Sequence, residues 1–92
     1  MEITYDPEKR RLTLEFRAID FRDAAQVFAG PEYTVVDDRA DYGEERYQTY
    51  GLLQGRLVQV VWTPRGYARH VMSMRKCNDR ERTRFEQRLG RP

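Results

Sequence analysis

The sequence predicts an α+β fold that consists of a strand, two helices, an antiparallel β-meander and a C-terminal helix. Apolar residues recur at helical spacing between residues 7 and 30, whereas they alternate with polar residues between residues 33 and 74. This change of period separates a helical part from a strand-rich part. The 92 residues contain no Ser- or Gly-rich linker, so we expect one domain over residues 1–92.

The first strand and the first helix meet at a clear boundary. "MEITY" alternates and contains β-branched residues, which predicts a short strand. Asp6 then stands as an N-cap and Pro7 as the first helical residue, a pair typical of a helix start. The helix that follows carries an apolar stripe, which consists of Leu12, Phe16 and Ile19.

A second helix is predicted after Asp20, which is a further N-cap candidate. Its apolar residues recur at i, i+3, i+4 and i+7, and they are Phe21, Ala24, Ala25 and Phe28. Gly30 in "AGPE" is expected to end this helix. We expect the helices to lie on one face of the sheet, so that the other, polar face stays partly open for single-stranded nucleic acid.

Four strands are predicted in the strand-rich part. "YTVVD" is a short strand and "DRADYG" a loop, and the longer strands "EERYQTYGLL", "RLVQVVWTP" and "GYARHVMSM" follow. The turn signals "QG" and "PRG" join these three strands, so we expect an antiparallel meander. Asn78 then caps a final helix, "DRERTRFEQRL", whose thin apolar stripe of Phe85 and Leu89 suggests that a partner protein covers it.

Positive charge is concentrated in the last third of the chain. Residues 1–64 hold eight Lys and Arg against twelve Asp and Glu, whereas residues 65–92 hold nine against three. Fifteen of the seventeen cations are Arg, whose planar guanidinium matches the geometry of phosphate. This favours an anionic partner, nucleic acid first, over the alternative of an Arg-rich surface that only contacts solvent.

Several classes of protein are excluded by composition. No apolar run approaches the roughly 20 residues that span a bilayer, and the N-terminus lacks the apolar core of a signal peptide. We therefore expect no membrane contact and a cytoplasmic location. The single Cys77 cannot form an internal disulfide, and one His with one Cys cannot build a zinc site, so we expect no metal and no cofactor.

The chain resembles the BrnT family of bacterial type II toxins over nearly its whole length. The matching stretches are "YDPEK", "IDFRDAAQVF", "DDRADYGEERYQTYGLLQGRLVQVVWTPRG" and "MSMRK". The resemblance implies a RelE-like fold and a ribonuclease that cleaves RNA and inhibits translation. It also implies a BrnA-type ribbon-helix-helix antitoxin as partner, which would neutralise the toxin in a hetero-oligomer.

The chain departs from the family pattern at two places. Phe16, Arg17 and Ala18 stand where the family has Lys-His-Gly, and His70 stands where relatives usually have Arg. An alternative function is therefore a catalytically degenerate module that binds an antitoxin or RNA.

The candidate catalytic residues are Arg75, Lys76, His70, Arg46 and Arg65. Cleavage without a metal needs a base for the ribose 2′-OH and cations for the negative charge of the phosphorane. His70 is a candidate acid or base, or else a partly buried histidine satisfied by a neighbour. Arg46 is expected on a central strand, where it either binds the phosphate or pairs with Glu44. The alternative for Arg75, Lys76 and Arg65 is a solvated position without a role in catalysis.

The candidate RNA-binding residues are Thr63, Tyr67, Arg69, Ser73 and Arg17. Strict alternation would place Arg69, Val71, Ser73 and Arg75 on one face and Ala68, His70, Met72 and Met74 on the other. Aromatic side chains could stack on bases, but we expect at least half of Tyr47, Tyr50, Trp62 and Tyr67 to lie in the core. The acidic loop "VVDDRADYGEE" is interpreted as a solvated turn, or else as a patch that faces the antitoxin or attracts a metal.

Overall fold

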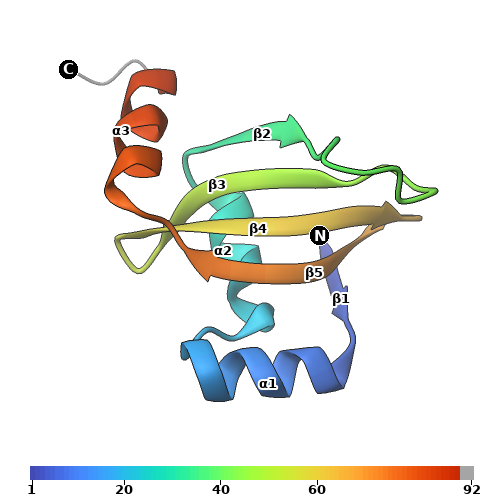
Figure 1. Ribbon diagram of the computed structural model, residues 1–92. Helices are drawn as coiled ribbons and strands as arrows, with labels where there is room; N and C mark the ends of the chain where they lie inside the picture. The colour runs from blue at the N-terminus through green and yellow to red at the C-terminus, as the bar shows by residue number, and fades with distance from the viewer. Residues whose placement is uncertain (90–92) are drawn as a thin grey trace.

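The structure, a computed structural model, describes residues 1–89 and contains one mixed sheet in the order β1-β5-β4-β3-β2. The strands are β1 (Glu2–Tyr5), β2 (Glu32–Val36), β3 (Tyr47–Leu53), β4 (Arg56–Arg65) and β5 (Ala68–Lys76). Strands β2 to β5 form the predicted antiparallel meander, and β1 pairs with β5 in parallel (Figure 1). The prediction of an α+β fold is therefore confirmed.

The helices begin where the sequence predicts. Helix α1 (Pro7–Arg17) starts at Asp6, whose carboxylate accepts a hydrogen bond from the backbone N–H of Glu8. Helix α3 (Asp79–Arg88) starts at Asn78 in a capping box that Glu81 completes. No helix within residues 1–89 is both long and apolar enough to cross a membrane.

The predicted second helix consists of two shorter pieces. A 3₁₀ turn, η1 (Phe21–Asp23), precedes the short helix α2 (Ala24–Ala29). The backbone N–H of Asp23 donates to the carbonyl of Asp20, an i to i+3 bond that tightens this first turn. Gly30 ends α2 as predicted, although in an extended conformation.

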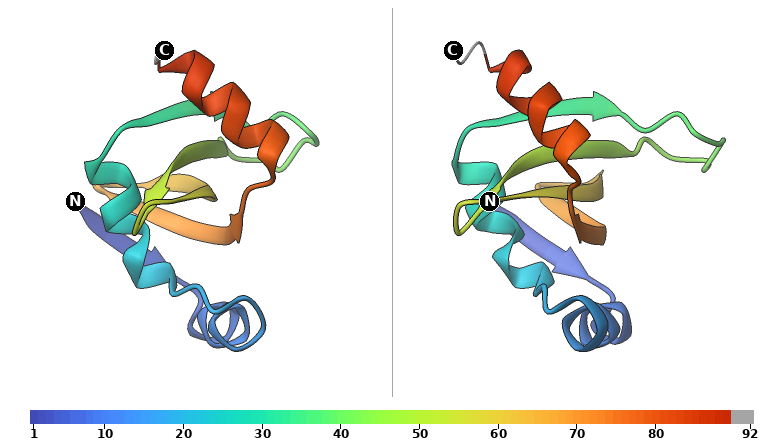
Figure 2. Two further views of the ribbon diagram at one scale, coloured as in Figure 1. Left: turned by 90° about the vertical axis from the view of Figure 1, so that its left-hand side faces the viewer. Right: turned by 60° about the vertical axis from the view of Figure 1, so that its left-hand side comes forward.

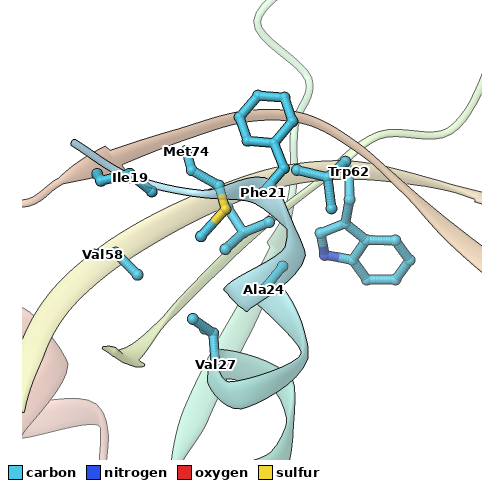
Figure 3. Packing of buried hydrophobic residues seen from close by; sticks show 9 residues of the cluster. Ile19, Phe21, Ala24, Val27, Val58, Trp62 and Met74 are labelled. Atoms are coloured by element: carbon cyan, nitrogen blue, oxygen red, sulfur yellow. The ribbon is translucent and has the colours of Figure 1, made fainter. Parts of the chain in front are cut away.

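One face of the sheet carries the main core, and α2 packs against it. Val58, Val60 and Trp62 on alternate positions of β4 lie against Phe21 and Val27 (Figure 3). The approach of α2 to β3 is so close that a Cβ atom on Gly51 would lie 2.7 Å from Cγ1 of Val27. Apolar burial on this face provides most of the stabilisation of the sheet.

The opposite face, called here the second face, is covered at one end by α3. Phe85 of α3 packs with Tyr50 and Leu57, whose side chains point away from α2. Helices α2 and α3 therefore lie on opposite sides of the sheet (Figure 2), and the expectation that all helices share one face is wrong. The thin apolar stripe of α3 therefore covers the apolar patch that Tyr50 and Leu57 form on the second face.

A β-bulge at Met72 changes the predicted faces of β5. Trp62 of β4 pairs with Val71, and the preceding Val61 pairs with Ser73, so that Met72 is an extra residue without a partner. Val71 and Met74 consequently both face the main core, where each is completely buried. His70, Ser73 and Arg75 share the second face, so the predicted division of this strand is wrong beyond Val71.

Candidate functional site

The end of the second face that lies away from α3 gathers polar residues from four segments. Thr63 of β4 pairs with His70 of β5, and Thr4 of β1 pairs with His70 from the other side. Arg65 is the last residue of β4, and the loop before β3 contributes Glu44. Chain topology thus brings the imidazole, a carboxylate and a guanidinium to one end of the second face.

Glu44 joins two arginines, and we refer to Glu44, Arg46, Arg65 and His70 as the Glu44 cluster. Its Oε1 lies 3.7 Å from Nη2 of Arg46, and its Oε2 lies 3.7 Å from Nη2 of Arg65. Arg46 precedes β3, so its expected place on a central strand is wrong, whereas the alternative pair with Glu44 is present. The carboxylate holds two guanidinium groups near each other, a geometry suited to binding a phosphate.

The surroundings of His70 favour its neutral form. Burial and then the positive charge of Arg65 lower the pKa of His70 below its usual value of 6.5, and Glu44 opposes this shift. The Oγ1 atom of Thr4 lies 2.8 Å from Nδ1, and within residues 1–89 no hydrogen bond involves Nε2. A neutral imidazole with one fixed nitrogen is suited to accept a proton near pH 7.

Arg46 has an unused donor. Its guanidinium stacks on the ring of Tyr42, with Cζ 3.9 Å from the ring centroid. Its Nε is buried and finds no hydrogen-bond partner in the described part of the chain. An unpaired buried N–H costs about 1–3 kcal/mol, so this arginine is held at a cost in stability.

Arg75 lies outside the Glu44 cluster. It is five residues beyond His70, roughly 15 Å along the strand. Its Nη1 and Nη2 donate to the two carboxylate oxygens of Glu81 at 2.9 and 2.7 Å, and this contact lowers the pKa of Glu81 to about 2. Lys76 pairs with Val58 and belongs to the other face, so the two neighbouring cations point apart.

The remaining candidate residues are dispersed. Arg69 lies on the α2 side, with its Cζ 4.4 Å from the ring centroid of Phe28 and 4.3 Å from that of Trp62. Nη1 of Arg17 donates to the carbonyl of Met74 at 2.8 Å. The hydroxyl of Thr63 is buried and donates to the carbonyl of Glu45, which fastens the acidic loop to β4.

The aromatic residues divide between core and surface. Tyr50 and Trp62 are buried, Tyr47 is half-buried against Trp62, and Tyr67 is fully exposed in the turn between β4 and β5. The expectation that at least half of the four lie in the core is confirmed, and Tyr67 remains accessible for stacking on a base.

The described residues support neither nucleophilic catalysis by Cys77 nor a metal site. Burial raises the pKa of Cys77 to about 12, so its thiol is no nucleophile near neutral pH. Within residues 1–89 no three His, Cys, Asp or Glu side chains are grouped so that they could hold a metal ion.

Glu44 was predicted only as an alternative partner of Arg46 and as one of several acids in the loop. Its contact with Arg65 and its place beside His70 were not predicted, because its spacing from these residues carries no periodic signal. The only local sign is the Glu-x-Arg spacing to Arg46 in "DYGEER".

The comparison with protein families assigns the chain to a family. A family model described as ribonuclease toxin, BrnT, of type II toxin–antitoxin system matches residues 5–81. The chain belongs to the BrnT family. A search of curated proteins finds no significant match.

The BrnT match includes every residue of the Glu44 cluster and ends at Glu81, the partner of Arg75. Membership implies a ribonuclease toxin with an RNA target and an antitoxin partner. The mixed sheet with its flanking helices is compatible with the RelE-like fold that the resemblance implies.

Proposed function

We propose that this BrnT protein is an endoribonuclease toxin that cleaves RNA without a metal ion, inhibits translation and is neutralised by a ribbon-helix-helix antitoxin in the cytoplasm. The observation that carries the catalytic part is the convergence of Glu44, Arg46, Arg65 and His70 at one end of the second face. Base, cations and an orienting carboxylate are the groups that metal-free cleavage needs.

The reaction follows from the charge state of these groups. The neutral imidazole of His70 accepts the proton of a ribose 2′-OH, and the 2′ oxygen attacks the adjacent phosphorus. The bond from phosphorus to the 5′ oxygen breaks, and water supplies a proton to that oxygen. The products are a 2′,3′-cyclic phosphate and a free 5′-OH.

The two arginines of the cluster stabilise the phosphorane. Its extra negative charge develops beside Arg46 and Arg65, which share their positive charge with Glu44 before substrate binds. Preorganised donors of this kind contribute about 10²- to 10³-fold in rate each.

The other candidates serve to bind the RNA chain in this proposal. Arg75 and Ser73 lie farther along β5 on the second face, where they would contact phosphates away from the scissile bond. Arg69 and Lys76 of β5 lie on the opposite face and could meet only RNA that passes around the sheet, whereas Arg17 lies at the end of α1 beside Met74. The exposed ring of Tyr67 would stack on a base near the Glu44 cluster.

A second candidate function is a catalytically degenerate module that still binds an antitoxin or RNA. It is favoured by one observation, that carboxylates already neutralise the main candidate arginines. Glu44 lies beside Arg46 and Arg65, and Glu81 binds both terminal nitrogens of Arg75. Such pairs must open or share their cation before RNA binds.

Expression of the chain in a bacterial host separates the two functions. The toxin proposal expects growth arrest with loss of protein synthesis, and rescue when the small protein encoded in the adjacent reading frame is expressed with it. Normal growth and unchanged protein synthesis at high expression of the folded chain would favour the degenerate module.

A further inference from the structure

Helix α1 exposes more apolar surface than its role in the fold explains. None of its eleven residues is buried, and Phe16 is 76% exposed, Leu14 42% and Leu12 38%. A helix this short is marginal in isolation, because helical stability in proteins comes mostly from packing of an apolar face. Leu12 and Phe16 are four residues apart and share one side of the helix, and exposed apolar residues that adjoin in this way mark an interaction surface.

A groove of about 310 Å³ runs between α1 and the bulge of β5, and we call it the α1 groove. Leu12, Phe16 and Met72 supply its apolar lining, and Lys9 and Arg17 supply its charged lining. Strand β1 ends opposite Val71, so the outer edge of β5 beyond that residue has no strand partner. The bulge and the missing partner strand together open this groove.

Charge on α1 is divided between two sides of the helix. Glu8, Arg11 and Glu15 pair with one another at i, i+3 and i+4 spacing. None of these three lines the α1 groove, and the charged residues that do line it are both cations. A complementary partner therefore presents apolar side chains together with Asp or Glu.

The α1 groove adjoins the candidate site. The positive charge of Lys9 contributes to lowering the pKa of His70, which places the two side chains within electrostatic reach. Ser73 lines the groove and shares the second face with His70. A bound segment would consequently lie next to the route by which RNA reaches the imidazole.

We propose that the antitoxin docks in the α1 groove through an apolar segment that carries acidic residues, and that it neutralises the toxin by covering the approach to His70. This inference rests on the proposed function, since it assumes an antitoxin partner. The three apolar lining residues favour a protein segment over RNA, because only one of them, Phe16, is aromatic and able to stack on a base.

The test measures binding of the purified protein encoded in the adjacent reading frame to the full chain. Leu12→Ser and Phe16→Ser alter the groove, and Leu14→Ser is the control, matched to Leu12→Ser, since Leu14 is 42% exposed against 38% for Leu12 but does not line the groove. Lys9→Glu is paired with Arg80→Glu, a charge reversal at an exposed position of α3. Circular dichroism checks that each variant is folded.

We expect Phe16→Ser to raise the Kd at least about 30-fold, the effect of losing a central interface residue, and Leu14→Ser to leave it within about threefold. Lys9→Glu should weaken binding about tenfold or more, and Arg80→Glu should not. In hydrogen exchange of the complex, residues 9–17 and 72–76 should gain more protection than α3.

Three results would overturn the inference. Equal affinity of Phe16→Ser and Leu14→Ser would remove the α1 groove as the docking site while leaving the antitoxin itself intact. Loss of binding to a 2′-O-methyl RNA oligonucleotide in Phe16→Ser, with unchanged protein binding, would assign the groove to RNA. Failure of the wild-type chain to bind its neighbour would contradict the proposed partner, and the inference with it.

Discussion

The hydroxyl of Thr4 and Nδ1 of His70 lie 2.8 Å apart, although 66 residues separate them in the chain. The parallel pairing of β1 with β5 makes this contact, since Thr4 and His70 are direct partners in the register. The contact fixes the orientation of the ring and thereby the direction of Nε2. The N-terminal strand is therefore a structural support of the Glu44 cluster.

Loss of the Thr4 hydroxyl should reduce activity without unfolding the protein. In Thr4→Val the ring of His70 is free to rotate, and we expect kcat for RNA cleavage to fall about tenfold while KM changes little. Thr4→Ser retains the hydroxyl and should keep most of the activity. Equal kcat in Thr4→Val and wild type would show that the contact does not position the base.

The pKa of His70 is directly measurable, because it is the only histidine in the chain. Its Cε1–H resonance should titrate below 6.5 in the wild type. Arg65→Gln removes one cause of this shift, so the pKa of His70 should rise. The acid limb of the pH–rate profile should then move to higher pH. Arg80→Gln is the control and should leave the titration unchanged.

The same shift affects stability at acidic pH. A folded-state pKa below 6.5 means that the unfolded chain binds the proton more readily. The contribution of His70 to stability is therefore fully present above pH 6.5 and is lost as the pH falls through the folded-state value. In Arg65→Gln this loss should become smaller.

The ion pair between Arg75 and Glu81 fastens α3 to β5. Glu81→Gln keeps a side chain that can complete the capping box but removes the charge, so the free energy of unfolding should fall by about 1 kcal/mol at pH 7. The pKa of Glu81 is lowered from 4.5 to about 2, so this difference should persist above pH 4.5 and vanish towards pH 2. Urea unfolding measures it.

The control for this pair is Glu86→Gln, at an exposed position of the same helix. It should change the free energy of unfolding by less than about 0.5 kcal/mol. A similar loss in both variants would attribute the effect to net charge rather than to the ion pair.

The contact between α2 and β3 depends on Gly51. A Cβ atom there would lie 2.7 Å from Cγ1 of Val27 and 3.3 Å from two backbone carbonyl oxygens, so Gly51→Ala should cost about 1–3 kcal/mol of stability. Gly30→Ala, whose Cβ would meet no atom closer than 3.8 Å, is the matched control. Thermal unfolding should show a lower Tm for Gly51→Ala alone.

Local signals in the sequence predicted most of the elements. Asp6 with Pro7, and Asn78, marked helix starts because N-caps act within a few residues of the chain. The turn at Gln54 and Gly55 was predicted from the dipeptide alone, and both residues have positive φ, as a two-residue hairpin requires.

The arrangement of the site depended on contacts between distant segments. The bulge at Met72 follows from the register of β5 against β4, which the alternation within one strand does not contain. The link from Glu44 to Arg46 and Arg65 required the fold to bring a loop and a turn together. Sequence reasoning therefore named three of the four residues of the cluster as site candidates and Glu44 only as a partner of Arg46, and it did not predict their grouping.

The most direct test of the account is cleavage of RNA by the purified chain in the presence of EDTA. We expect the wild type to cleave and to leave 2′,3′-cyclic phosphate ends, and His70→Asn to be slower by about 10²- to 10⁴-fold while it stays folded. Absence of cleavage at high wild-type concentration, or equal rates in the wild type and His70→Asn, would contradict it.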